Sequence, residues 1–228
     1  MTAEMEHVRV ERHGDVALVR IDRPPANALD LSLLDEGHRV LAELGAAEPG
    51  AVVLTGRDGF FSAGVDLKVA PTLDAAAQRE MVAGINRLFA GWYGFPRPVV
   101  CAVNGHAIAG GLILALCGDH RVGARAGRYG LTELAVGVPY PVVALAVVRG
   151  ELTAAAARRL ALGAELVGPE EALALGCLDE LADDPLGRAL EVAERMAGLP
   201  VAAYAAAKEQ LRGVLPDAEA DPLLARWL

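Results

Sequence analysis

The sequence predicts an α/β fold with a helical C-terminal region, and three observations support this prediction. Short apolar runs that end at glycine, proline or asparagine alternate with stretches of helical periodicity in the first half of the chain. The final third consists mainly of alanine-rich segments with helix start and stop signals. Of the 228 residues, 54% are hydrophobic and 4% aromatic, so one large domain can bury a core built from Ala, Leu and Val.

The N-terminal elements follow from hydrophobic periodicity and turn residues. Residues 8–12 and 16–21 flank His-Gly-Asp, a sequence typical of the turn of a β-hairpin. Leucines at near-helical spacing predict an amphipathic helix over residues 31–44. Further elements are expected in this order: a buried strand at residues 51–55, a helix at 73–92, a buried strand at 98–103, a short helix at 110–117 and a strand that begins at 119.

Capping signals define the helices of the final third. Pro169 occupies a first-turn position, where a missing N–H leaves no hydrogen bond unmade, and Gly176 can end that helix. A second helix is expected to begin at Pro185 and to end at Gly198. The last full helix is expected at residues 202–212, and a tail with one apolar end follows it.

Composition and charge argue against several function classes. The net charge of −9, without any Lys/Arg run, argues against a nucleic-acid partner. Cys101, Cys117 and Cys177 lie in apolar stretches without metal-ligand spacing, so buried thiols and no metal site are expected. Residues 98–118 carry no charge if His106 is neutral, but their glycines favour two short buried elements over a membrane span. The charged N-terminal segment lacks the apolar stretch of a signal peptide, so a cytoplasmic location is expected.

Two glycine-containing loops are candidates for catalytic chemistry. The first covers residues 60–68 and the second residues 104–111, and a buried strand leads into each. Each loop can direct one backbone N–H at the same oxygen atom, and two such amides make an oxyanion hole. The second loop also opens a helix, whose N-terminus supplies free N–H groups and a positive dipole. Either loop alone could be an ordinary turn, and neither matches the dinucleotide-binding pattern.

Glu133 is the candidate acid/base, since it is the only charged residue between residues 131 and 148. A solvated position at a strand edge is the alternative. Its uncharged surroundings favour burial instead, which raises a carboxyl pKa toward the range where the group can take and return a proton. His106 is expected to be a structural loop residue, and Asp119 and Arg121 are expected to make structural contacts. No Ser/His/Asp arrangement stands out.

These segments resemble the crotonase superfamily of enoyl-CoA hydratases and isomerases. The resemblance extends over residues 8–213 and is carried by Arg-Pro-Pro-Ala-Asn-Ala-Leu at 23–29, Phe-Ser-Ala-Gly-Val-Asp-Leu at 61–67, Asn-Gly-His-Ala-Ile-Ala-Gly-Gly at 104–111, and Glu133 with Gly137. It implies a spiral of ββα turns, with a core at residues 1–198 and a short C-terminal helical region at 199–228. It also implies an acyl-CoA thioester as substrate, without a separate cofactor, and assembly as trimers or paired trimers.

The resemblance implies roles for individual residues. The backbone N–H groups of Val65 and Gly110 would hold the thioester oxygen, beside Glu133 as the catalytic acid/base. The remaining assignments are Ala63, Asp66 and Leu67 against the adenine, Arg23 and Lys68 as cations near the CoA phosphates, and Ile113, Pro139 and Tyr140 along the acyl chain. Phe89 and Trp92 are weaker candidates for the acyl pocket, and core packing is favoured for both.

One position departs from the hydratase pattern. Hydratases of this superfamily carry a glutamate three residues after the oxyanion glycine and a second one in the later motif. Here the first position is Ile113, and only Glu133 remains. Syn addition of water requires two carboxylates, whereas moving a double bond from C3–C4 to C2–C3 requires one base that returns the proton as an acid. Residues 137–141 also resemble the mitochondrial-type Δ3,Δ2-enoyl-CoA isomerases more than the glycine-rich stretch of hydratases.

We therefore predict an enoyl-CoA isomerase with Glu133 as its single acid/base. Two alternatives stay open: an enoyl-CoA hydratase or another acyl-CoA enzyme with a different base, and a non-catalytic acyl-CoA-binding protein. Family members commonly have more helical sequence after Gly213, part of which caps the site of a neighbouring subunit. Residues 221–228 are therefore expected to provide a weaker cap.

Overall fold

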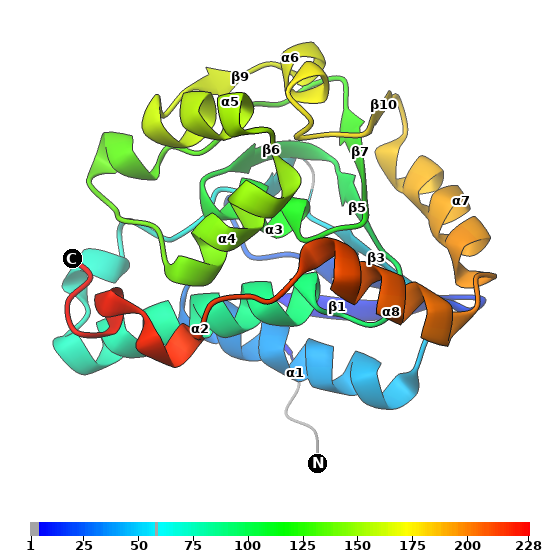
Figure 1. Cartoon of the computed structure of the whole chain (residues 1–228), viewed down its shortest axis with the longest axis horizontal. Coiled ribbons are helices and arrows are strands. Elements are labelled where there is room, and N and C mark those ends of the chain that lie inside the picture. The colour runs from blue at the N-terminus through cyan, green and yellow to red at the C-terminus, as the bar shows by residue number, and fades with distance from the viewer. Residues whose placement is uncertain (1–4, 58) are drawn as a thin grey trace.

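A six-stranded sheet with helices on both faces organises the computed structural model, which describes residues 5–57 and 59–228 (Figure 1). In spatial order its strands are β1 (Val8–His13), β2 (Val16–Ile21), β3 (Ala51–Thr55), β5 (Val99–Val103), β7 (His120–Ala124) and β10 (Glu180–Ala182). The first pair is the predicted antiparallel hairpin, and every later pair is parallel. Strands β3 and β5 are buried along their whole length, as expected for parallel strands with both faces covered. Residues 1–4 of the predicted core lie outside the described part.

A second sheet of four short strands carries the two glycine-containing loops. Its strands, in spatial order, are β4 (Gly59–Ser62), β6 (Gly105–Ile108), β8 (Tyr129–Gly130) and β9 (Leu166–Val167). Strands β4, β6 and β8 follow β3, β5 and β7 along the chain, so each turn contributes one strand to each sheet. This arrangement confirms the predicted spiral. The close approach of β4 and β6 requires glycine, because a Cβ at Gly105 would lie 2.1 Å from the carbonyl oxygen of Gly59.

Helices pack on both faces of the six-stranded sheet (Figure 1). The helices of the described residues are α1 (Leu31–Ala47), α2 (Ala75–Tyr93), α3 (Gly110–Leu116), α4 (Val142–Glu151), α5 (Ala154–Ala157), α6 (Pro169–Ala174), α7 (Pro185–Ala197) and α8 (Val201–Arg212). Helix α7 covers one face through Ala189, Val192 and Ala193. Helices α1, α2 and α3 belong to the larger core on the other face. Asp30 and Asp74 cap α1 and α2, since each side chain accepts a hydrogen bond from a first-turn amide.

The final third is not entirely helical, contrary to the prediction. It also contains β9 and β10, and β10 extends the large sheet beside β7, with Glu180 opposite Val122. Strands of two or three residues are too short to show an alternating pattern, so hydrophobic periodicity does not reveal them. Shorter helical turns complete the chain: η1 (Ala70–Thr72), η2 (Glu133–Val136), the π-helical η3 (Arg158–Leu162), η4 (Ala218–Ala220) and η5 (Pro222–Leu224).

Buried ion pairs attach α8 to the end of the sheet. Asp119 accepts a hydrogen bond from Lys208 Nζ at 2.8 Å and pairs with Arg212 at 3.0 Å. Arg121 instead pairs with Asp179, at 2.9 Å. Asp119 and Arg121 thus make structural contacts, as predicted, each with partners from the C-terminal third.

Within residues 5–57 and 59–228, no helix is long and apolar enough to cross a membrane. Within the same ranges, no group of three or more His, Cys, Asp or Glu side chains could hold a metal ion. Cys101, Cys117 and Cys177 are buried and free.

Candidate active site

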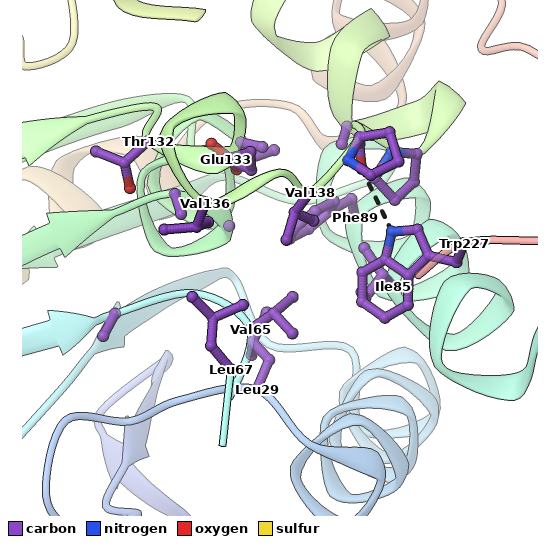
Figure 2. A pocket seen from close by; sticks show the side chains of 17 residues that line it. Leu29, Val65, Leu67, Ile85, Phe89, Thr132, Glu133, Val136, Val138 and Trp227 are labelled. Atoms are coloured by element: carbon purple, nitrogen blue, oxygen red, sulfur yellow. Dashed lines mark hydrogen bonds between the residues drawn. The ribbon is translucent and has the colours of Figure 1, made fainter. Parts of the chain in front are cut away.

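A mostly apolar pocket lies where the two glycine-containing loops meet the segment around Glu133 (Figure 2). The space between its walls amounts to about 570 Å³, part of which is open solvent. Its walls come from the loop after β4, from α2, from the start of α3, from residues 132–141 and from the C-terminal tail. Among the described residues that line it, Glu133 is the only one with an ionisable side chain.

The first loop presents the backbone N–H of Val65. Leu29 forms a parallel bridge with Val65, in which Leu29 N donates to Gly64 O at 2.7 Å and Asp66 N donates to Leu29 O at 2.9 Å. In this geometry the N–H of Val65 itself points away from Leu29. Val65 also lines the pocket, so its amide is available to an acceptor placed there.

The second loop presents the N–H of Gly110, the first residue of α3, which has no intrahelical acceptor. Ala109 precedes it at φ 54° and ψ −130°, a strained conformation for a residue with a side chain. The two loops touch, because a Cβ at Gly64 would lie 2.8 Å from Gly110 N. The two candidate amides therefore lie on neighbouring loops, and both residues line the pocket.

Glu133 is buried, with 7% of its surface exposed, and it begins η2. Burial raises the pKa of its carboxyl from 4.5 to about 7, while its own backbone amide and the Tyr140 hydroxyl oppose this shift. The Oε2 atom has no hydrogen-bond partner among the described residues. The left-handed turn at Gly137, with φ 75°, lets Val138 N donate to Glu133 O at 2.9 Å and fixes the segment. The carboxyl is thus desolvated and held in position beside the Tyr140 hydroxyl.

Of the three residues predicted to lie along the acyl chain, Ile113 and Pro139 line the pocket, but Tyr140 does not. The Tyr140 hydroxyl donates to the carbonyl oxygens of Leu131 at 3.2 Å and Ala161 at 3.4 Å. Burial is the largest cause of the raised pKa of Tyr140, so its hydroxyl stays protonated. Tyr140 therefore connects the segment around Glu133 to residue 161 and does not form a wall of the pocket.

The residues predicted for the CoA end divide into two groups. Ala63 and Leu67 line the pocket, and Lys68 is exposed next to them. Arg23 is instead neutralised by two carboxylates, Asp30 at 2.6 Å and Asp66 at 3.2 Å. Arg23 and Asp66 thus connect the first loop to the start of α1, and neither side chain lines the pocket.

Several lining residues, Thr132 and Trp227 among them, were not assigned to the site from the sequence, and Phe89 was only a weaker candidate. Phe89 lies on the buried face of α2, where helical periodicity predicts burial but does not separate core from pocket. Thr132 precedes the catalytic candidate and has no motif of its own. Trp227 lies in the C-terminal tail, and nothing in the sequence pattern predicts its long-range contact. Trp92, by contrast, is buried in the core as predicted.

Comparison with known proteins identifies the family. The family model described as enoyl-CoA hydratase/isomerase matches residues 11–225. A probable enoyl-CoA hydratase from Mycobacterium avium is 35% identical over 214 residues, which cover 91% of this chain and 83% of the relative. The solved structure of a probable enoyl-CoA hydratase from Mycobacterium tuberculosis has a TM-score of 0.87 at 34% identity and covers 91% of this chain and 89% of that chain. A second structure from that organism, described as an enoyl-CoA isomerase, has a TM-score of 0.85 at 34% identity and covers 90% of each chain. The chain therefore belongs to the enoyl-CoA hydratase/isomerase family of the crotonase superfamily.

Proposed function

We propose that this crotonase-type acyl-CoA enzyme is a Δ3,Δ2-enoyl-CoA isomerase. One observation carries the proposal: among the described residues that line the pocket, Glu133 has the single carboxyl group, and Ile113 is buried where the hydratases of the superfamily have their other glutamate. A reaction that needs one group for both proton transfers fits this site. A reaction that needs two carboxylates does not.

In the proposed mechanism, the thioester oxygen accepts hydrogen bonds from the N–H groups of Val65 and Gly110. The ionised Glu133 takes a proton from C2, and the electron pair spreads over C2 to C4 and the thioester oxygen. The two amides stabilise the negative charge that develops on this oxygen. Protonated Glu133 then returns the proton to C4, so the double bond moves from C3–C4 to C2–C3 and the carboxylate is regenerated. A pKa of about 7 suits a group that must do both.

The second candidate is an enoyl-CoA hydratase, which the similarity to the probable enoyl-CoA hydratase of Mycobacterium avium favours. The two functions separate when the protein is incubated with a 3-enoyl-CoA and, separately, with a 2-enoyl-CoA. We expect the first to be converted to the 2-enoyl product and the second to remain unhydrated. Efficient hydration of the 2-enoyl-CoA would overturn the isomerase proposal, and tight binding without turnover of either would favour an acyl-CoA-binding protein.

We place the CoA moiety at the loop after β4. Ala63 and Leu67 line the pocket there, and the exposed Lys68 is positioned to meet the phosphates. Arg23 is already paired with two carboxylates, so we now assign it a structural part. Lys68→Ala should raise KM for acyl-CoA with little change in kcat, and an unchanged KM would remove Lys68 from the site.

We also propose that the protein assembles as a trimer or a pair of trimers. Support comes from the family resemblance and from large apolar side chains exposed on several elements, among them Leu134, Leu145, Leu162, Leu173 and Leu211. Such surface is typical of protein–protein contacts when it is contiguous. Light scattering should give a mass three or six times that of the chain, and a stable monomer would contradict the proposal.

A further inference from the structure

The C-terminal tail reaches the pocket and supplies one of its walls. After α8, the short turns η4 and η5 pack against α2. Trp227 follows them, with 6% of its surface exposed, and lines the pocket beside Ile85 of α2. Its Nε1–H donates to Pro139 O at 3.4 Å. Figure 2 shows Trp227 and Glu133 on different sides of the pocket, with Val138 and Phe89 between them.

A buried carboxylate holds this tail in place. Asp221 is 3% exposed. Its Oδ2 accepts hydrogen bonds from Asn86 Nδ2 at 2.8 Å and from Val142 N at 2.9 Å, and its Oδ1 accepts one from Leu223 N at 2.9 Å. Asn86 Oδ1 in turn accepts a hydrogen bond from Val143 N at 3.1 Å, which fixes the orientation of the amide. One side chain therefore joins the tail to α2 and to the first turn of α4, through charge-assisted hydrogen bonds in a buried setting.

The pocket has a polar side and an apolar side. Thr132 and Glu133 lie together on one side (Figure 2). Toward Trp227 the lining is apolar and includes Ile85, Phe89 and Val138 (Figure 2). If C2 and C4 of the substrate face Glu133, the carbons beyond C4 have to enter this apolar part. The indole of Trp227 then stands in the direction in which a longer acyl chain would extend.

We propose that Trp227 is the end wall of the acyl site, that Asp221 is the positioning residue that holds it there, and that this wall selects short acyl chains. The inference rests on the proposed acyl-CoA substrate and specifies its length class. Trp227→Ala removes the indole and opens space beyond the wall. Each substrate methylene that becomes buried in this space should then raise affinity about fourfold.

Saturated acyl-CoA thioesters test the wall without any turnover. Calorimetry would measure Kd from butyryl-CoA to decanoyl-CoA for the wild type, Trp227→Ala and Trp227→Phe. For the wild type, affinity should stop rising at a short chain. It should keep rising, about fourfold per methylene, for Trp227→Ala, with Trp227→Phe in between. Tyr140→Ala tests the sequence-based alternative for the wall and should keep the wild-type profile. Identical profiles for the wild type and Trp227→Ala would overturn the inference.

Fluorescence tests the positioning role of Asp221. The sequence has two tryptophans, so Trp227 reports alone in a Trp92→Phe background. There, Asp221→Asn should shift the Trp227 emission to the red, increase its quenching by acrylamide and give the length profile of Trp227→Ala. Unchanged emission together with an unchanged profile would overturn the positioning role. If the wild type binds short acyl-CoA with the expected cut-off in chain length but does not isomerise 3-enoyl-CoA, the proposed reaction is contradicted. The role of Trp227 as the end wall of the acyl site is then still supported.

Discussion

The substitution Glu133→Gln should have opposite effects on the stability of the fold and on the activity of the enzyme, because both depend on the buried Glu133 carboxyl group. The side chain keeps its shape but can no longer ionise. Burial raises the pKa of Glu133 from 4.5 to about 7, so the folded protein disfavours the ionised form. Below pH 4.5 the group is protonated in both the folded and the unfolded state and has no effect. Above pH 7 it is ionised in both, and the full shift of the pKa destabilises the fold. At about 1.4 kcal/mol per pKa unit, this amounts to roughly 3 kcal/mol.

The variant should therefore be more stable than the wild type by roughly 3 kcal/mol at pH 8.5 and by less than about 1 kcal/mol at pH 5. Activity should move the other way. General acid–base catalysis contributes about 10²–10⁴-fold, and one residue serves both transfers here, so kcat should fall by at least that range with KM little changed. Urea unfolding at the two pH values and isomerase kinetics on 3-enoyl-CoA measure the two effects on the same samples. If the variant gains no stability at pH 8.5, the carboxyl of Glu133 is not desolvated. If the variant keeps most of the wild-type kcat, Glu133 is not the catalytic acid/base.

The remaining predictions concern pH, the glycine loop and the position of the absent glutamate. For the wild type, kcat/KM of isomerisation should rise with pH and reach half its maximum near pH 7, as the base ionises; a flat profile between pH 5.5 and 8.5 would contradict this. Gly64→Ala should lower kcat/KM by about 100-fold or more, because a Cβ would lie 2.8 Å from Gly110 N and displace an amide. Gly14→Ala is its control, since Gly14 also has positive φ but its Cβ would meet nothing within 4 Å, so stability alone should fall. Ile113→Glu should bring trace hydration of 2-enoyl-CoA at a cost in stability; a folded variant without hydration would show that this position does not separate the two reactions.

The elements that the sequence predicted are those with a sustained pattern. Strands β3 and β5 are five-residue runs of apolar residues, apart from the final Thr55 of β3, and α2 repeats its apolar residues over five turns. The hydrophobic pattern was therefore sufficient to predict both the strands and the helix. Strands β4 and β6 have four residues each and overlap the two glycine-containing loops, so the local pattern indicated a loop. Their pairing is set by the second sheet, which is a tertiary property that no local pattern contains.

The site was predictable where chemistry is encoded in residue type and spacing. Val65, Gly110, Glu133, Ile113 and Pro139 were all predicted and all line one pocket. Side-chain pairing was not predictable in the same way.

Arg23 illustrates the difference. Its sequence position is compatible with a free cation, and only the fold places Asp30 and Asp66 on either side of it. The same holds for Trp227, which is more than 80 residues from the Pro139 carbonyl that it contacts.

A buried hydrogen-bond network around Asn27 and Ser62 stabilises the loop that carries the Val65 amide. Asn27 is fully buried, and its side chain donates to the carbonyl oxygens of Ile21 at 3.0 Å and of Phe60 and Phe61 at 3.1 Å. Ser62 Oγ donates to Asn27 O at 2.8 Å and accepts from Gly64 N at 3.2 Å.

These hydrogen bonds hold the loop without involving the N–H of Val65, which we propose donates to the thioester oxygen. An oxyanion hole works only if its donors are fixed before the charge develops, because any reorganisation would add to the barrier. The strained Ala109 and the desolvated Glu133 both lower stability at this place, and the buried Asn27 network and the Arg23 ion pairs next to it offset that loss.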